Sequence, residues 1–157
     1  MKSLSEVINE GLFNRFKNKY KTPYVIIEWD NAYTSDSDYD RAMGLKTIQG
    51  QIKEDCETII RQALKRYGVS YSEHETQMHA VSTMQQLQFN FRHDIDVADF
   101  EDLSAEIYTY INKLVHAEYK NDAHIETEEE FEEWTIYIPF TKGSTDGRCI
   151  NIYIGRE

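Results

Sequence analysis

The sequence predicts an α+β fold: a two-layer sandwich with a mostly antiparallel sheet, two long helices on one face, and an additional N-terminal amphipathic helix. Two long segments have apolar residues at helical spacing, and several short segments alternate apolar and polar residues as half-buried strands do. The length of 157 residues fits a single domain. In such a fold, long amphipathic helices between half-polar strands cover one face of the sheet and leave the other face partly exposed to solvent.

The first expected element is an amphipathic helix over residues 3–19. Its apolar residues are spaced four apart and share one helix face: Leu4, Ile8, Leu12 and Phe16. Ser3 and Glu6 form a capping box, in which hydroxyl and carboxylate satisfy backbone amides at the helix start. A basic amphipathic helix either docks on a partner or membrane surface or folds onto the body, and the pattern leaves both open.

Residues 24–29 form a β-prone apolar run, which predicts a buried strand. After a polar loop, a helix is expected from about residue 41 to 67, with Gly68 at the left-handed position just beyond its end. Its apolar stripe consists of Leu45, Ile48, Ile52, Cys56, Ile59, Ala63 and Leu64.

The middle of the chain predicts a short strand over residues 69–71, a polar loop over 72–77 and a strand over 83–92. The core-facing residues of that last strand alternate: Leu87, Phe89 and Phe91.

A second long helix is expected to begin at Asp96 or Asp99 and to end near Tyr119. Its apolar stripe consists of Phe100, Leu103, Ile107, Tyr110, Ile111 and Leu114. The alternating segments 134–140 and 149–154 then predict a closing hairpin. Pro139 places the first of these strands at a sheet edge or makes it end early.

The charge is divided unevenly along the chain. Residues 1–22 carry five basic and two acidic residues, a net +3 within a total of −11, so residues 23–157 carry −14. This division predicts a basic amphipathic docking helix and hinge over 1–22, followed by a single acidic α+β domain over 23–157. The acidity of the body argues against direct nucleic-acid binding there. No apolar run approaches the roughly 20 residues of a transmembrane segment.

An acidic surface is expected just before the closing hairpin. It consists of Glu128, Glu129, Glu130, Glu132 and Glu133. Such a cluster can mimic the phosphate backbone of DNA and occupy a basic nucleic-acid-binding protein. It can equally be a solvated charged loop beside a strand edge.

Several short patterns approach metal-binding motifs, and each lacks a required residue. Asp36, Asp38 and Asp40 resemble half of a calcium loop, but the glycine and the final glutamate are missing. His74 and His79 are five residues apart, whereas a helical zinc pair needs four. The sequence therefore predicts no metal and no cofactor.

The remaining histidines give no local catalytic signature. His124 and Glu126 match the start of a zinc-deaminase motif, but its paired cysteines are absent. His93 lies beside Asp94 and Asp96, which suits either a proton relay or a strand end followed by a helix cap. No catalytic residue is therefore expected, although an enzyme whose site is assembled from separated residues stays open.

The two cysteines, Cys56 and Cys149, are too few for a disulfide framework. They predict two free thiols in a reducing compartment, with a single bridge as the alternative. The start of the chain also lacks the long apolar core of a secretory signal. These features predict a cytoplasmic location.

The first eleven residues, Met-Lys-Ser-Leu-Ser-Glu-Val-Ile-Asn-Glu-Gly, resemble the capsid-targeting segments of internal head proteins in large tailed phages. Those segments form a short amphipathic helix and end in Ile/Leu-x-Glu before a small residue, where a prohead protease cuts. The matching positions are Ile8, Glu10 and Gly11. The resemblance implies a phage-encoded protein, processing after Glu10, and a location in the host cytoplasm or the virion.

Taken together, the patterns favour a small non-enzymatic accessory protein that docks on a protein partner or capsid through its N-terminal helix. An acidic inhibitor of a nucleic-acid-binding or host-defence protein is the first alternative. A small enzyme with a non-local site, built around His74 or His93, is the second.

Overall fold

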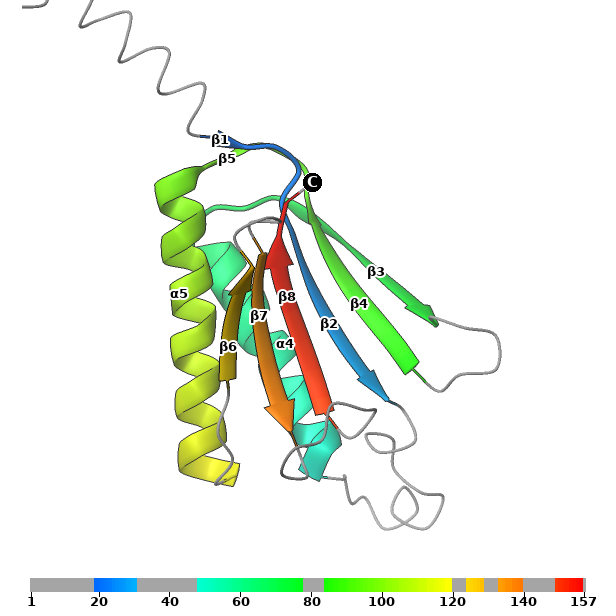
Figure 1. The fold of residues 1–157 in the computed structure, drawn as a ribbon. Coiled ribbons are helices and arrows are strands. Elements are labelled where there is room, and N and C mark those ends of the chain that lie inside the picture. Colours follow the sequence, from blue (N-terminus) through cyan, green and yellow to red (C-terminus); the bar gives the residue numbers. More distant parts are fainter. Residues whose placement is uncertain are drawn as a thin grey trace, which may run out of the picture.

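The computed structural model describes residues 19–30, 48–77, 84–119, 124–128, 133–139 and 149–156. Figure 1 shows their arrangement as a sheet backed by helices. In chain order the elements are β1 (Lys19–Tyr20), β2 (Tyr24–Asp30), α4 (Ile48–Arg66), β3 (Tyr71–Gln77), β4 (Met84–Phe91), β5 (Ile95–Asp96), α5 (Val97–Leu114), the π-helical turn η1 (Val115–Tyr119), β6 (His124–Glu128), β7 (Glu133–Pro139) and β8 (Cys149–Gly155).

The main sheet has six strands in the order β3-β4-β2-β8-β7-β6, and every neighbouring pair is antiparallel. The last strand of the chain, β8, lies between β2 and β7 in the middle of this sheet (Figure 1). β1 and β5 form a separate two-stranded sheet. The predicted α+β class and the closing β7–β8 hairpin are therefore confirmed.

One face of the six-stranded sheet is buried beneath α4 and α5. Every second residue of the central strands is 0–7% exposed and points into this core: Val25, Ile27, Trp29, Leu87, Phe89, Phe91, Ile136, Ile138, Ile150, Ile152 and Ile154. The helices contribute the opposing side chains: Ile52, Cys56, Ile60, Ala63, Leu64, Phe100, Leu103, Ile107 and Ile111. Residues between the buried strand positions lie on the other face, which the helices do not cover (Figure 1).

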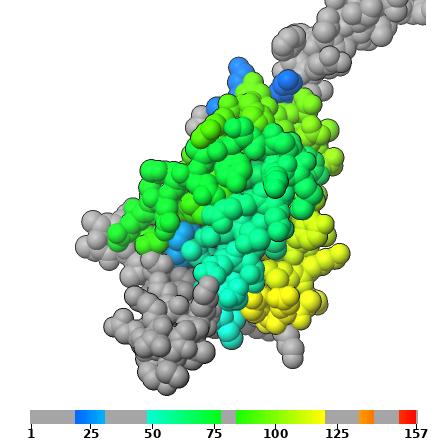
Figure 2. All heavy atoms as spheres, turned by 180° about the vertical axis from the view of Figure 1, so that it is seen from behind, coloured from blue at the N-terminus to red at the C-terminus, as the bar shows by residue number. Residues whose placement is uncertain are grey.

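The two helices pack side by side on the rear of the sheet, as the view from behind shows (Figure 2). Arg66 Nε of α4 donates to Glu106 Oε1 of α5 at 2.9 Å. Tyr119 Oη of η1 donates to Asp55 Oδ2 of α4 at 2.8 Å. Burial, aided by the hydrogen bond to Asp55, raises the pKa of Tyr119 to about 12. These contacts hold the two helices in register over the core.

The C-terminus of α4 confirms the expected stop signal at Gly68. The glycine has φ +66°, a left-handed conformation that an L side chain rarely adopts. Its N–H donates to Lys65 O at 3.1 Å, while Val69 N–H donates to Leu64 O at 2.9 Å. This pair of bonds is the Schellman motif, which satisfies the last helical carbonyls and turns the chain toward β3.

The small β1–β5 sheet attaches the start of the described chain to the N-terminus of α5. Lys19 pairs with Asp96, and Tyr20 with Ile95. Tyr20 also packs edge-on against Phe100, with ring centroids 5.1 Å apart.

The structure corrects several boundaries expected from the sequence. Residues 72–77 are not a loop, because they belong to β3, which pairs with β4 from Tyr71 to Gln77. Residues 124–128 form β6, an unexpected strand beside β7. β7 is therefore not an edge strand, and Pro139 stands at its end.

The helix predictions are corrected at individual positions. Asp96 is the N-cap residue of α5, but its side chain makes no capping hydrogen bond. Ile48 and Tyr110, both expected in apolar stripes, are 63% and 46% exposed. Cys56 is a free, buried thiol, so the alternative of a bridge to Cys149 is wrong. Burial also raises the pKa of the Cys56 thiol, which makes it a poor nucleophile.

Candidate functional site

The uncovered side of the sheet is the best-defined candidate surface among the described residues. We call it the open face and define it by ten half-buried residues on four adjacent strands: Gln86, Gln88 and Asn90 (β4), Tyr24, Ile26 and Glu28 (β2), Asn151 and Tyr153 (β8), and Thr135 and Tyr137 (β7). Each of these residues alternates with buried core residues of its own strand, so its side chain points to the side of the sheet away from the core.

Strand register arranges these residues in two rows across the sheet. The first row runs Gln86, Glu28, Asn151 and Tyr137. The second row runs Gln88, Ile26, Tyr153 and Thr135. Adjacent strands lie about 4.8 Å apart, so neighbouring side chains in a row are within contact distance.

Glu28 is the charged residue among these ten, and Asp30, two residues further along β2, places a second half-buried carboxylate on the same side of the strand. Glu28 accepts side-chain hydrogen bonds from Asn151 on one neighbouring strand and Gln86 on the other. Both partners are neutral amides, so neither supplies a positive charge to offset the removal of this carboxylate from water. Desolvation by burial outweighs the two hydrogen bonds, and the pKa of Glu28 is raised above its ordinary value.

The rest of the open face is made of carboxamides and tyrosines. Gln88 Nε2 donates to Asn90 Oδ1 at 2.7 Å along β4. Of the ten residues, four are carboxamides, three are tyrosines and none is lysine or arginine. Tyrosine enrichment and lysine depletion are typical of protein–protein interfaces.

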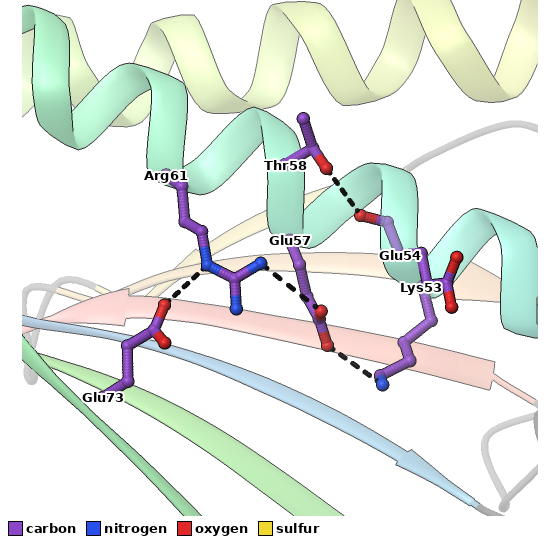
Figure 3. Close-up of polar contacts among 6 residues, drawn as sticks. All are labelled: Lys53, Glu54, Glu57, Thr58, Arg61 and Glu73. Atoms are coloured by element: carbon purple, nitrogen blue, oxygen red, sulfur yellow. Dashed lines mark hydrogen bonds and ion pairs between the residues drawn. The ribbon is translucent and has the colours of Figure 1, made fainter.

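The basic side chains of this part of the molecule lie on the helix side of the sheet instead (Figure 3). Arg61 Nε of α4 donates to Glu73 Oε1 of β3 at 2.6 Å, and this bond raises the pKa of Arg61. Glu57 lies 3.0 Å from Lys53 Nζ and 3.7 Å from Arg61. Lys53 also lies 4.2 Å above the ring of Trp29. This ionic cluster attaches the edge strand β3 to α4 and engages Lys53 and Arg61 on the helix side.

His74 and His93, the considered histidines whose side chains the structure describes, do not form a catalytic constellation with each other. His74 is an exposed residue of β3. His93 accepts a hydrogen bond from Ser70 N–H through Nε2 at 3.0 Å, and its Nδ1 lies 2.9 Å from the carbonyl oxygen of Asp94. An accepting Nε2 means that Nδ1 carries the proton and donates to that carbonyl. His93 therefore joins two backbone segments, as expected of a strand end.

Some of the sites predicted from the sequence lie outside the described residues, either completely or in part. The docking residues Leu4, Ile8, Leu12 and Phe16, the processing positions Glu10 and Gly11, and the calcium-like Asp36, Asp38 and Asp40 all lie there. So do His79, Glu129, Glu130 and Glu132. Glu128 ends β6 and Glu133 begins β7, and the two are paired across the strands. His124 and Glu126 belong to β6.

Neither a metal cluster nor a membrane span emerges from the described part of the chain. Within it, no group of three or more His, Cys, Asp or Glu side chains could hold a metal ion. None of the described helices combines the length and the apolar character needed to cross a bilayer.

One feature of the sequence could have indicated the open face, although the alternating strand patterns did not distinguish it. Glu28 is the one charged residue inside the apolar run of residues 24–29. Its partners Gln86 and Asn151 lie far away in the chain and meet it only through strand pairing.

The fold and site together define a two-layer α+β protein with a sheet face that the described helices leave uncovered and that carries the desolvated carboxylate of Glu28. Comparison with protein-family models, curated proteins and solved structures finds no significant match.

Replacement of Glu28 tests the desolvation of this carboxylate. A raised folded-state pKa means that the folded chain binds a proton more tightly than the unfolded chain, so Glu28 lowers stability increasingly as the pH rises above about 4.5. We expect Glu28→Gln to have a higher free energy of unfolding than the wild type at pH 7. The difference should shrink as the pH approaches 4.5, measured by urea unfolding at both pH values. An equal difference at both would contradict the desolvation argument.

Proposed function

We propose that this chain is a small accessory protein without catalytic activity, which acts by binding a protein partner. The observation that supports this most is the open face, a wide tyrosine- and carboxamide-rich surface over which none of the described elements lies. Proteins retain such surfaces where they meet partners, because aromatic and amide side chains combine apolar contact with adaptable hydrogen bonding.

The basic segment 1–22 is proposed as the docking element of the same protein. Its apolar residues Leu4, Ile8, Leu12 and Phe16 would contact the partner or a capsid, as amphipathic helices do in hydrophobic grooves. The resemblance to capsid-targeting segments supports a phage origin and processing after Glu10. Because that cut removes Leu4 and Ile8, docking through the full apolar stripe precedes it. The intact mass of the protein from purified particles tests this part, since a chain beginning at Met1 would exclude the cleavage.

Introduction of negative charge into the apolar stripe tests the docking segment. We expect the double variant Ile8→Asp/Phe16→Asp to recover at least about tenfold less partner than the wild type, because two anchors of an apolar contact are lost. Partner recovery would be measured by cross-linking in cells of origin and quantitative mass spectrometry. The control Asn9→Asp/Asn14→Asp adds the same charge at polar helix positions. Equal losses in both variants would refute a specific apolar contact.

A second candidate, an acidic inhibitor of a nucleic-acid-binding or host-defence protein, is favoured by the charge distribution. The body carries −14, and its open face has no lysine or arginine to repel a basic target. Exposed charges are screened beyond about 8–10 Å at physiological salt, so this function requires salt-sensitive binding. Unchanged affinity after neutralisation of Glu128, Glu129, Glu130, Glu132 and Glu133 would exclude that acidic surface as the contact.

A further inference from the structure

The open face has a chemistry that selects among possible partners. Its ten residues offer the carboxylate of Glu28, several amide and phenol oxygens, and no lysine or arginine, and Asp30 adds a second carboxylate on the same side of β2. Like charge would repel an acidic segment or a nucleic-acid backbone, whereas a cation would find in Glu28 a carboxylate whose hydrogen-bond partners, Asn151 and Gln86, are both neutral. The complementary occupant is therefore cationic.

The neighbours of Glu28 further favour arginine over lysine. Asn151 lies directly across from Glu28, and Tyr153 is its diagonal neighbour on the same strand. Tyr137 lies across from Asn151 on the next strand. A guanidinium can pair with a carboxylate through two parallel hydrogen bonds and stack on a tyrosine ring at the same time, which a compact ammonium cannot do.

We propose that the open face binds an arginine-bearing segment of a partner protein, with Glu28 as the anchor for one guanidinium and Tyr153 as its aromatic wall. This inference rests on the proposed function, since it names the chemistry of the protein partner. Binding places a cation beside this desolvated carboxylate, which becomes ion-paired in the complex.

The basic segment of the chain itself is a less suitable occupant. Lys19, which follows residues 1–18, pairs with Asp96 at the start of α5, on the side of the molecule where the helix layer begins. The experiment below includes this occupant as a separate outcome.

Defined peptides test the proposal with the full purified chain. The probes are a short Gly/Ser peptide with spaced arginines, the same peptide with citrulline, which is isosteric but neutral, and the same peptide with lysine. Amide resonances of the isotope-labelled chain are followed by NMR during titration. We expect the arginine peptide to shift resonances of β2 and β8, the lysine peptide to bind more weakly, and the citrulline peptide to leave them unchanged.

Two matched variants distinguish a specific role of Glu28 from a general effect of the negative charge of the protein. Glu28→Gln should weaken binding of the arginine peptide by about tenfold or more, the loss expected for a charge-assisted hydrogen bond. Glu75→Gln removes the same charge from an exposed residue of the same sheet. Glu75 pairs with the core residue Leu87, so it lies on the helix side, and this control should retain wild-type affinity. Thermal unfolding of each variant confirms that the fold is kept.

Four outcomes would overturn the inference. These are no shifts with the arginine peptide, shifts confined to the helices, equal losses in the two variants, and equal binding of the citrulline peptide. A large gain in affinity on deleting residues 1–18 would instead assign the face to the chain's own basic segment. The proposed function is tested separately. It would be refuted if cross-linking recovered no partner, independently of the result of the peptide titrations.

Discussion

Ile152→Asp is expected to leave the chain without a cooperative unfolding transition at neutral pH. Ile152 is 0% exposed on β8, between Ile27 on β2 and Ile136 on β7, and the helices close the same core. An unpaired carboxylate there costs several kcal/mol beyond the lost apolar contact, against a total stability of about 5–15 kcal/mol for a domain. Circular dichroism during heating measures the transition.

The adjacent residue supplies the control for this prediction. Tyr153→Asp introduces the same charge one position along β8, but on the half-buried open face. Its side chain can reach water, so we expect this variant to keep a cooperative transition and to lose no more than about 1–3 kcal/mol. If the two variants were equally destabilised, the assignment of opposite faces to these residues would be wrong.

Phe100→Ala is expected to lower the free energy of unfolding by about 3–5 kcal/mol, the usual cost of deleting a buried aromatic ring. Phe100 is 1% exposed near the start of α5. Its ring meets Tyr20 at 5.1 Å and Phe91 at 6.3 Å, both edge-on, so it joins α5 to β1 and β4. Urea unfolding measures the loss. Tyr110→Ala on the same helix, at 46% exposure, should cost far less.

A milder replacement of the same residue tests its local role. Phe100→Leu keeps an apolar side chain but removes the ring that contacts Tyr20. We expect trypsin to cut beside Lys19 faster than in the wild type, since β1 pairs with β5 over two residues and the ring of Phe100 is one of the groups that hold Tyr20. An unchanged cutting rate would mean that the other contacts of β1, which include the β1–β5 pairing and Arg156 over the Tyr20 ring, are enough to fix this segment.

The parts of the fold that follow an apolar period could be predicted from the sequence. β2, β4, β7 and β8 alternate cleanly because one face of each is buried. β3 shows no such pattern, since from Glu73 onward it is exposed and is held by backbone pairing with β4 and by the Arg61–Glu73 contact. Local periodicity contains no information about an edge strand stabilised in this way.

The candidate site was harder to predict for a different reason. Glu28, Gln86 and Asn151 come from three strands, and their proximity depends on strand order, which the sequence does not specify. Only the isolated carboxylate within an apolar run marked the position in advance. The Glu28→Gln variant is expected to gain stability and lose binding together, a trade-off common at functional sites.

The central position of β8 has a consequence for the order in which the molecule is made. β2 is translated well before β8, yet the two must pair in the middle of the sheet. Until the residues of β8 emerge from the ribosome, β2 lacks one neighbour and β7 lacks its link to the rest of the sheet. Pairing between such distant segments is also slow, because a long loop must close first. Residues 1–18 therefore emerge, and become available to any partner, well before the body that follows them has folded.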